Sequence, residues 1–479
     1  MSKQKLKNDV EILDFLERLR EDGIKIWAEG DKIRYRVINS QLPLEVLENI
    51  KRSKKELLDF FTMVEKNEVP LTSMQLAYIV GQKPECELSD INAHYYIEFK
   101  TSELDIERLE KAINIVITKN DALRMIVTHE GKASFLENVP FYSIPVHFVK
   151  KEEDRRQKRT ERSHYRYNYY KWPMFYFGVG KTIDRNDILY VDFDCIILDA
   201  WSAKLMLEEI FELYMGKDVP FPQFSFMEYM RIKTHTKNQK AEAYWKSRLK
   251  YISKIPALNF QKKFVEVQHM NFERVEYGFS IEETNSLNKK IKEFCFTPAA
   301  VLSTIFMKTL TQYSNTSEVA VNVTLFNRQP LHKEVNRVLG EFTNTAVISY
   351  REETHSILNA IRETQNQMWK VVQYRDFDGM NILRMLSRGN PGKAVMPIVF
   401  TCMVGGSMSV GEKRNYPFKE EFAISQTPQV ILDHHVRDDL GYLKISWDYL
   451  EEIFDRQNIA EMFRAYIVNI KKFINNNVI

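Results

Sequence analysis

Cysteine, glycine and proline are all scarce in this chain of 479 residues, and neither sign of charge dominates it. The four cysteines are far apart, with no CxxC and no Cys/His cluster: Cys86, Cys195, Cys295 and Cys402. This spacing excludes a structural zinc site and a dense disulfide framework. Lys plus Arg number 68 and Asp plus Glu number 65, a net charge of +3, so the basic excess of a dedicated nucleic-acid binder is missing. We therefore expect a reducing, cytoplasmic setting.

Long hydrophobic runs are missing too. No stretch approaches the roughly 18 apolar residues that a membrane span needs, and no apolar segment follows the basic start as in a secretory signal. Apolar residues make up 44% and charged residues 28%, which is typical of globular proteins and excludes disorder over most of the chain. At ~150 residues per domain, the length predicts about three domains or lobes. Aromatics, at 12%, suit large cores or a lined tunnel.

Residues 1–62 have the pattern of a small separate domain. Apolar residues at helical spacing predict a first helix: Val10, Leu13, Leu16 and Leu19. Period-two alternation on both sides of Gly30-Asp31 predicts a β-hairpin. Two further helices are expected at 43–50 and 53–61, and a short polar joint at 66–68.

The second strand of this hairpin carries Lys32, Arg34 and Arg36 on one face. Two interpretations account for these charges. They form a solvated face that discourages aggregation, or they form a cationic strand that accepts an acidic extended tail. FLERLREDGIKIWAEGDKIRYRV followed by LPLEVLENIKRSKKELLDFF resembles the tubulysin-type docking domain. That resemblance favours the second interpretation, with an upstream synthetase subunit as the partner.

The rest of the chain reads as mixed α and β. Apolar runs predict strands at 93–99, 188–193, 319–325, 346–350, 396–401, 429–434 and 442–448. Helical patterns lie at 104–119, 203–214, 241–249, 298–313, 357–372 and 451–473. This length exceeds one ordinary core, so we expect two lobes, at 68–250 and 251–479.

One segment, 150–171, interleaves Arg and Lys with tyrosines in the manner of a surface that stacks nucleic-acid bases. A helix with solvated charges is the simpler interpretation, because the chain has no basic surplus elsewhere. We expect neither a nucleic-acid partner nor a membrane partner.

The sequence DFDCIILDAWS places Asp194 at the end of a predicted strand, Asp199 in the following loop and Ser202 near the start of a helix. Taken alone this motif is weak, since a loop aspartate and a helix N-cap account for it. It occurs, however, in order with several other blocks: VPLTSMQLAYIVGQ, NDALRMIV, WPMF, TPAAVLSTIFMKTLTQYS, TLFNRQP, GEFTNT, PIVFTCM and SQTPQVILDHHVRDDLGYLKISWD.

This series of blocks resembles the heterocyclization domains of nonribosomal peptide synthetases, a branch of the condensation superfamily, over residues 68–475. The resemblance implies an α/β fold of two chloramphenicol-acetyltransferase-like lobes in a V, with a tunnel between them. It implies no bound cofactor or metal; phosphopantetheine arms of donor and acceptor carrier proteins would bring the substrates. The implied reaction joins a carrier-bound acyl or peptidyl thioester to carrier-bound Cys, Ser or Thr. The side chain then closes on the new amide with loss of water, giving a thiazoline or oxazoline.

This chemistry needs a group that can give and take protons, and a carboxyl in an apolar tunnel can do both. Asp433 follows a predicted buried strand, and Thr401 at the end of PIVF can orient water or a hydroxyl. In the family the corresponding residues are the leading candidates for cyclodehydration. A strand-end turn residue and ordinary strand packing are the competing interpretations of Asp433 and Thr401.

Asp194 and Asp199 stand where ordinary condensation domains carry HHxxxDG, and we expect them to support the shape of the tunnel. Asp199 would pair with a guanidinium, that of Arg124 or Arg328. Asn327 is a lesser candidate for contact with the substrate amide, and Gln429 belongs to the supporting motif.

His434 begins a literal HHxxxD, but it lies in the wrong half of the chain and Leu440 stands where Gly is expected. We expect His434 and His435 to alternate across the end of a strand.

Five residues depart from the family pattern: Gln82, Asn120, Glu341, Asn344 and Cys402. They put the substrate preference in doubt more than the activity. A condensation domain that makes only the amide and a non-catalytic docking module are the alternative functions. The sequence leaves open the acyl donor, the nucleophile, the oligomeric state, and whether the chain is the front of a longer subunit.

Overall fold

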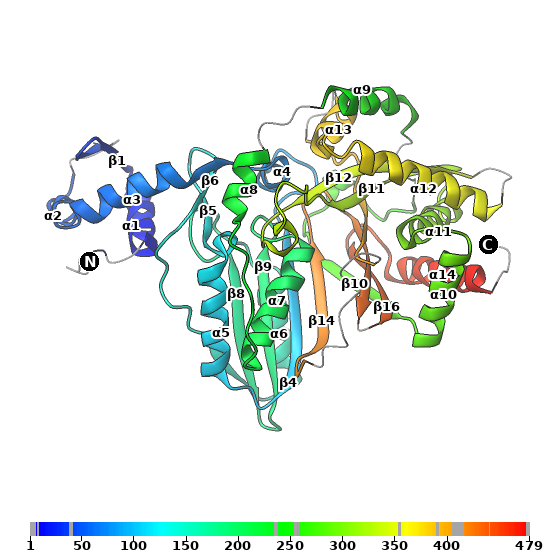
Figure 1. Ribbon diagram of the computed structural model, residues 1–479, viewed down its shortest axis with the longest axis horizontal. Helices are drawn as coiled ribbons and strands as arrows, with labels where there is room; N and C mark the ends of the chain where they lie inside the picture. Colours follow the sequence, from blue (N-terminus) through cyan, green and yellow to red (C-terminus); the bar gives the residue numbers. More distant parts are fainter. Residues whose placement is uncertain are drawn as a thin grey trace.

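The computed structural model describes residues 6, 9–37, 42–233, 238–252, 256, 258–352, 356–388, 392–404, 416–439 and 441–475. The chain runs from a small N-terminal domain, through a first lobe, to a second lobe, and the N- and C-terminal ends lie on opposite sides of the molecule (Figure 1).

The N-terminal domain has the predicted order of helix, hairpin, helix and helix. Its elements are α1 (Asp9–Glu21), β1 (Ile24–Glu29), β2 (Lys32–Val37), α2 (Leu44–Arg52) and α3 (Lys54–Asn67). Gly30 occupies the left-handed region at the hairpin turn, with φ +60°, which explains a glycine there. The predicted face of α1 is partly wrong, because Ile12 and Phe15 are buried with Leu19, whereas Val10, Leu13 and Leu16 are only half-buried.

The polar joint predicted at 66–68 is not a loop. Helix α3 continues through Asn67, and Glu68 begins β3 (Glu68–Pro70), which pairs with β6 (Lys132–Phe135) of the first lobe. The Asn67 side chain donates to Glu137 at 3.2 Å, and backbone N–H groups of Glu137 and Asn138 donate to Asp9. The N-terminal domain is therefore bonded to the first lobe along α1 and α3, and α3 crosses the domain boundary predicted at residue 62.

The first lobe is built on a five-stranded sheet in the order β14-β4-β9-β8-β7. Its strands are β4 (His94–Ser102), β7 (Val146–Val149), β8 (Phe175–Thr182), β9 (Asn186–Asp194) and β14 (Lys419–Gln426). Helices α5 (Ile106–Lys119) and α7 (Ala200–Tyr214) bury an apolar face in the core of this lobe. Phe99 of β4 meets Phe211 of α7 edge to face, with ring centroids 5.3 Å apart.

The second lobe is built on a six-stranded sheet in the order β10-β16-β15-β13-β11-β12. The strands are β10 (Phe272–Gly278), β11 (Glu318–Phe326), β12 (Thr343–Arg351), β13 (Ile398–Cys402), β15 (Leu432–Asp439) and β16 (Tyr442–Leu450). Helices α11 (Pro298–Gln312) and α14 (Arg456–Ile474) pack on one face of this sheet. Phe306 and Tyr466 meet Trp447 of β16 there. Strand β13 runs parallel to both β11 and β15.

Strand β14 joins the two lobes. It follows β13 in the sequence, yet it pairs antiparallel with β4 of the first lobe, from Lys419↔Lys100 to Gln426↔His94. The sheets therefore do not follow a cut at residue 250, and sequence patterning missed β14 altogether.

The remaining elements connect the two lobes or cover them: α4 (Ser73–Gly81), η1 (Asp121–Arg124), β5 (Met125–Val127), α6 (Glu152–Ser163), α8 (Phe226–Lys233), α9 (Gln239–Arg248), η2 (Leu249–Tyr251), η3 (Phe264–Glu266), α10 (Ile281–Glu293), η4 (Val335–Arg337), α12 (Ile357–Gln373) and α13 (Gly379–Leu386). No single helix among the described segments is long and apolar enough to cross a membrane, and one bent pair, α10 with α11, passes on length and composition.

Candidate active site

The strand that carries Asp433 presents alternate side chains to opposite faces of the second sheet. In the parallel ladder Val399 pairs with Asp433 and Thr401 with His435. Thr401 and Asp433 are therefore on one face, the face opposite α11 and α14. Both are buried, at 5% and 6% exposure. The two residues predicted for the chemistry are neighbours on adjacent strands.

Several polar atoms on this face have no hydrogen-bond partner within the described chain: Oδ1 of Asp433, Nε2 of His435, Oδ1 of Asn322, Oγ1 of Thr345 and Oγ of Ser446. Thr401 donates to Thr324 Oγ1 at 2.8 Å. Buried polar groups are nearly always paired in folded proteins. The helix-covered face has unpaired atoms too, the ring nitrogens of His434 and Trp447 in the aromatic core. The unpaired carboxylate, amide and hydroxyl oxygens lie on the Asp433 face, which marks that face as a candidate site for a polar ligand.

Asp448 lies opposite Asp433 in the antiparallel ladder with β16 and is held firmly. Arg274 of β10 binds it through two hydrogen bonds of 2.6 Å, and the Ser425 N–H of β14 donates to it at 2.9 Å. Burial alone would raise the pKa of Asp448, but Arg274 and His435 lower it to about 2. Asp448 is thus a fixed negative charge beside the candidate site.

His434 and His435 alternate across the strand as expected, though β15 runs on to Asp439, well past the predicted end of the strand. His434 faces the helices and packs between Phe306 and Phe400, with ring centroids 4.6 and 4.8 Å away. Burial lowers the pKa of His434 well below its ordinary value. His434 is a core residue, so the literal HHxxxD match is not a catalytic motif; Leu440 lies outside the described residues.

The DFDCIILDAWS aspartates are placed as expected. Asp194 ends β9, is fully buried, and accepts hydrogen bonds from Asn92 Nδ2 at 2.7 Å and the Ile196 N–H at 2.9 Å. Burial raises the pKa of Asp194 to about 6. Asp199 caps α7 by accepting from the Ser202 N–H at 2.7 Å. Both carboxylates are thus bound by neighbouring groups, although Oδ2 of Asp199 has no hydrogen-bond partner in the described chain.

Arg328 is the guanidinium that reaches Asp199, at 3.3 Å. It also donates to Ser202 Oγ at 2.7 Å and to two backbone carbonyls, Val335 O at 2.9 Å and Val338 O at 2.6 Å. Ser202 Oγ in turn bonds both the N–H and the carbonyl of Gly340. Helix α7 of the first lobe is thereby fastened to the segment between β11 and β12 of the second lobe.

Arg124, the alternative partner of Asp199, is elsewhere. Its guanidinium donates to backbone carbonyls that include Ile117 O at 2.6 Å and Leu136 O at 2.9 Å. Arg124 therefore closes the end of α5 against β6 and does not support the motif. The expectation for it was wrong because Arg124 follows α5 by a few residues, where the last carbonyls of the helix have no intrahelical partner and accept from it.

Asn327 follows β11 directly, and Gln429 lies in the loop before β15. Asn327 is buried, donates to Arg375 O at 3.4 Å, and keeps Oδ1 unpaired within the described chain. Gln429 adopts a left-handed φ of 64° and donates to Gly392 O at 3.3 Å. The contact that we predicted between Asn327 and a substrate amide stays a prediction.

Glu341, one of the departures from the family pattern, is a buried carboxyl group near the DFDCIILDAWS segment. It accepts from the Thr343 N–H at 2.8 Å and from Thr72 Oγ1 at 3.2 Å. Burial, with Asp199 nearby, raises the pKa of Glu341 to about 8. Glu341 is therefore largely protonated at neutral pH.

The other departures are accommodated separately. Gln82 bonds the hydroxyl of Tyr169. Asn120 donates to Glu209 at 3.3 Å, and Asn344 Oδ1 accepts from the Gly379 N–H at 2.8 Å. Cys402, the next residue after Thr401, is on the opposite face of the sheet, toward α14, and burial raises the pKa of its thiol to about 11.

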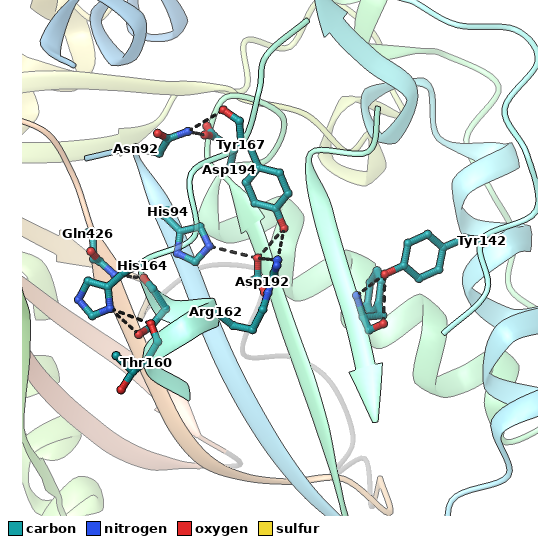
Figure 2. A network of polar contacts seen from close by, with 12 residues as sticks. Asn92, His94, Tyr142, Thr160, Arg162, His164, Tyr167, Asp192, Asp194 and Gln426 are labelled. Atoms are coloured by element: carbon teal, nitrogen blue, oxygen red, sulfur yellow. Dashed lines mark hydrogen bonds and ion pairs between the residues drawn. The ribbon is translucent and has the colours of Figure 1, made fainter. Parts of the chain in front are cut away.

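Part of the basic and aromatic segment at 150–171 faces the interior. Arg162 of α6 forms two hydrogen bonds to Asp192 of β9, which also bonds His94 and Tyr167 (Figure 2). Arg155 and Arg159 bind the buried Glu98 at 2.8 and 2.6 Å. Three of the arginines are thus in internal ion pairs, and Tyr167 and Tyr169 are buried at 9% exposure, which favours the simpler interpretation of this segment.

His435 is the site residue that sequence reasoning missed. Its Nε2 is 3.2 Å from Asp433 Oδ2 and 3.4 Å from Asp448 Oδ2. The spacing of Asp433 and His435, two residues apart in one strand, was the available signal, because such residues share a face. Arg274 could not have been found, since its partner Asp448 lies 174 residues away. No group of three or more side chains suited to a metal ion occurs in the described ranges.

In comparisons with known proteins, residues 65–477 match the condensation domain family and residues 12–62 match the TubC N-terminal docking domain. The chain belongs to the condensation domain family. The predicted condensation-superfamily domain, the docking domain in front of it and the acyl-transferase class of the enzyme are thus confirmed.

Curated relatives are much longer than this chain. It is 28% identical over 425 residues to bacitracin synthase 1 of Bacillus licheniformis, covering 85% of this chain and 8% of that protein. It is 25% identical over 485 residues to pyochelin synthetase PchF of Pseudomonas aeruginosa, covering 95% and 26%. It is 24% identical over 409 residues to phenyloxazoline synthase MbtB of Mycobacterium sp., covering 84% and 35%. The chain spans about a third or less of each.

Solved structures share the whole architecture. The EpoB cyclization-docking bidomain from Sorangium cellulosum matches with a TM-score of 0.76 at 22% identity, covering 97% of this chain and 98% of that one. The synthetase FmoA3 matches with a TM-score of 0.74 at 23% identity, covering 85% and 42%. The predicted two-lobed α/β fold with a docking domain is confirmed by these matches.

Proposed function

We propose that this condensation-family domain is a heterocyclization domain of a nonribosomal peptide synthetase. It joins a carrier-bound acyl or peptidyl thioester to a carrier-bound Cys, Ser or Thr, then closes the side chain onto the new amide with loss of water. The observation that carries the proposal is the buried polar face of the second lobe. There Oδ1 of Asp433 has no partner among the described residues, and Asp433 lies on the strand beside Thr401.

Amide formation asks little of side chains, because holding the amine against the thioester supplies much of the rate. Cyclodehydration is harder: the nucleophile must lose its proton, the carbonyl oxygen must leave as water, and the amide nitrogen must lose a proton. Asp433 accepts and returns these protons, and Thr401 orients the departing oxygen through its hydroxyl. The 2.8 Å hydrogen bond to Thr324 fixes the Thr401 hydroxyl.

The DFDCIILDAWS aspartates have a structural role in this proposal. Asp194 is saturated by Asn92 and the following backbone, and Asp199 is held by Ser202 and Arg328. An ordinary condensation domain carries histidines in this motif. Aspartates bound in this way favour the cyclizing branch. The printed names of relatives, a phenyloxazoline synthase and a cyclization-docking bidomain, agree with this assignment.

The partners follow from the two domains. Donor and acceptor carrier proteins bring the thioesters on phosphopantetheine arms, and the docking domain takes the acidic C-terminal tail of an upstream subunit. Lys32, Arg34 and Arg36 are all exposed on β2, which pairs only with β1 among the described strands. Arg34 contacts Glu29 at 2.6 Å, an exposed pair of small net energy that an acidic tail can replace. All four cysteines are free, which suits the cytoplasm that we propose as the location.

The test is a reaction between a donor carrier loaded with an acyl group and acceptor carriers loaded with Cys, Ser or Thr. Intact-protein mass spectrometry follows the acceptor carrier. We expect a product lighter by one water than the linear amide with at least one of the three residues. Linear amide alone would mean a condensation domain, and unreacted thioesters would mean a non-catalytic docking module.

A further inference from the structure

His435 lies between two carboxylates that differ in how they are held. Asp448 has its full set of partners in Arg274, Ser425 and His435. Asp433 has only His435, within ion-pair distance of Oδ2, and its Oδ1 has no partner in the described chain. The imidazole Nε2 thus lies at ion-pair distance from both carboxylates, 3.2 Å from Asp433 and 3.4 Å from Asp448, and neither contact has the geometry of a hydrogen bond.

The surrounding elements supply further charges. Arg274 of β10 faces the cluster, as do Arg437 of β15, Lys444 of β16 and Glu420 of β14. Glu420 is paired with both Arg437 and Lys444, at 2.9 and 3.2 Å. These cations are thus engaged by Glu420 and Asp448, which leaves His435 as the cation nearest to Asp433 in the described cluster.

We propose that His435 is a positioning residue for cyclodehydration: as an imidazolium it holds Oδ2 of Asp433, so that Oδ1 is presented to the substrate. This inference rests on the proposed function and deepens it. His435 Nε2 is 3.2 Å from Oδ2, and the ladder places His435 beside Thr401. One side chain thus lies at ion-pair distance from Asp433 and next to Thr401 in the ladder.

The charge of His435 agrees with this role. Burial alone would lower the pKa of His435, but Asp433 and Asp448 outweigh burial and raise it to about 9. His434, one residue earlier, faces the aromatic core and has its pKa lowered instead. Because side chains alternate along the strand, two adjacent histidines have different charges at neutral pH: His434 is neutral and His435 is cationic.

The imidazolium does not enter the proton balance. In the ring-closing step the side-chain S–H or O–H bond breaks, a bond forms from S or O to the amide carbon, and the carbonyl oxygen takes up that proton. In the dehydrating step the C–O bond breaks and the C=N bond forms, and the hydroxyl leaves with the nitrogen proton as water. Asp433 carries these protons. His435 keeps its own proton and fixes the orientation of the carboxylate.

The experiment compares His435→Gln with wild type in the carrier-bound assay, using the acceptor residue that wild type cyclizes. Condensation and cyclization are measured separately, as linear amide and ring. His269→Gln, at an exposed histidine, is the matched control. We expect His435→Gln to condense within a few-fold of wild type and to cyclize on the order of 10-fold more slowly. That is less than the 10²- to 10⁴-fold loss expected for removing an acid–base group itself.

The pH dependence gives a readout that a merely structural role would not move. Because the raised pKa of His435 makes it cationic below about pH 9, wild-type cyclization relative to condensation should fall as the pH rises through 9. His435→Gln should lack this fall. The wild-type profile alone tests the idea if the variant does not fold.

If wild type and His435→Gln gave the same ratio of ring to linear amide and the same dependence of that ratio on pH, the role of His435 would be overturned. The proposed function would still stand. A variant that loses condensation and cyclization alike would also overturn the role of His435, since the effect would then not be specific to ring formation. A wild type that makes no ring at any pH would overturn the proposed function, and this inference with it.

Discussion

Replacing Arg328 with Met should greatly weaken the contact between the two lobes. The guanidinium lies in the interior, at 3% side-chain exposure, and serves Asp199, Ser202 and the carbonyls of Val335 and Val338. Met has a similar length and no donors, so the variant leaves a buried carboxylate and two carbonyls without their partner. Breaking a buried ion pair from one side costs about 3–5 kcal/mol.

That loss should be visible in a melting curve. For a lobe of about 200 residues, a loss of about 4 kcal/mol corresponds to a fall in the thermal midpoint of roughly 8–16 °C. Arg34→Met is the matched control, because Arg34 and its partner Glu29 are exposed at 52% and 62%. The control should change stability by less than about 1 kcal/mol. The Asp199→Asn/Arg328→Met double variant should recover part of the loss, since no unpaired charge remains.

The thermal midpoints are measured by differential scanning calorimetry of wild type, the two single variants and the double variant. At this size the thermal midpoint shifts by roughly 2–4 °C per kcal/mol, so a shift of less than about 2 °C means a loss of about 1 kcal/mol at most. An Arg328→Met variant that melts this close to wild type would refute the assignment of Arg328 as the support of the motif. So would a double variant no more stable than the single one.

Three other changes test the site and the docking strand. Asp433→Ala should stall the reaction at the linear amide, with cyclization slowed by about 10²- to 10⁴-fold; a ring formed at the wild-type rate would contradict the role of Asp433. Glu341→Gln should flatten the pH dependence of stability. Because burial raises the folded pKa of Glu341 to about 8, wild type binds this proton more tightly when folded and loses stability as the pH rises from about 4.5 to 8; parallel curves of melting temperature against pH for the two proteins would contradict this. Lys32→Glu/Arg34→Glu/Arg36→Glu should abolish binding of an acidic tail peptide in calorimetry while carrier-loaded condensation continues; unchanged binding would exclude β2 as the docking strand.

Short-range patterns predicted much of the fold. The hairpin of the docking domain, most strands of the second sheet and the long helices follow from alternation and helical spacing in residues that neighbour one another. In the first sheet only β4 and β9 were predicted, and β7, β8 and β14 were missed. The paired aspartates and Ser202 were placed correctly at a strand end and a helix start, because capping is a local interaction: Asp199 accepts from a residue three positions later. In α1 the local pattern failed in part, since both Val10 and Ile12 suit a helix face. Only the contact with the rest of the domain selects which of them is buried.

The sequence by itself determined the family, the order of the domains and the candidacy of Asp433 and Thr401. Only the tertiary structure decided their surroundings. Strand β14 crosses to the first sheet because its edge bonds are completed by β4, a strand more than 300 residues earlier. The choice of Arg328 over Arg124 and the place of Arg274 beside Asp448 depend on which strands and loops become neighbours. The charge of His435 depends on the same neighbours, because electrostatic energies are set by distance in space and by burial, and sequence spacing fixes neither.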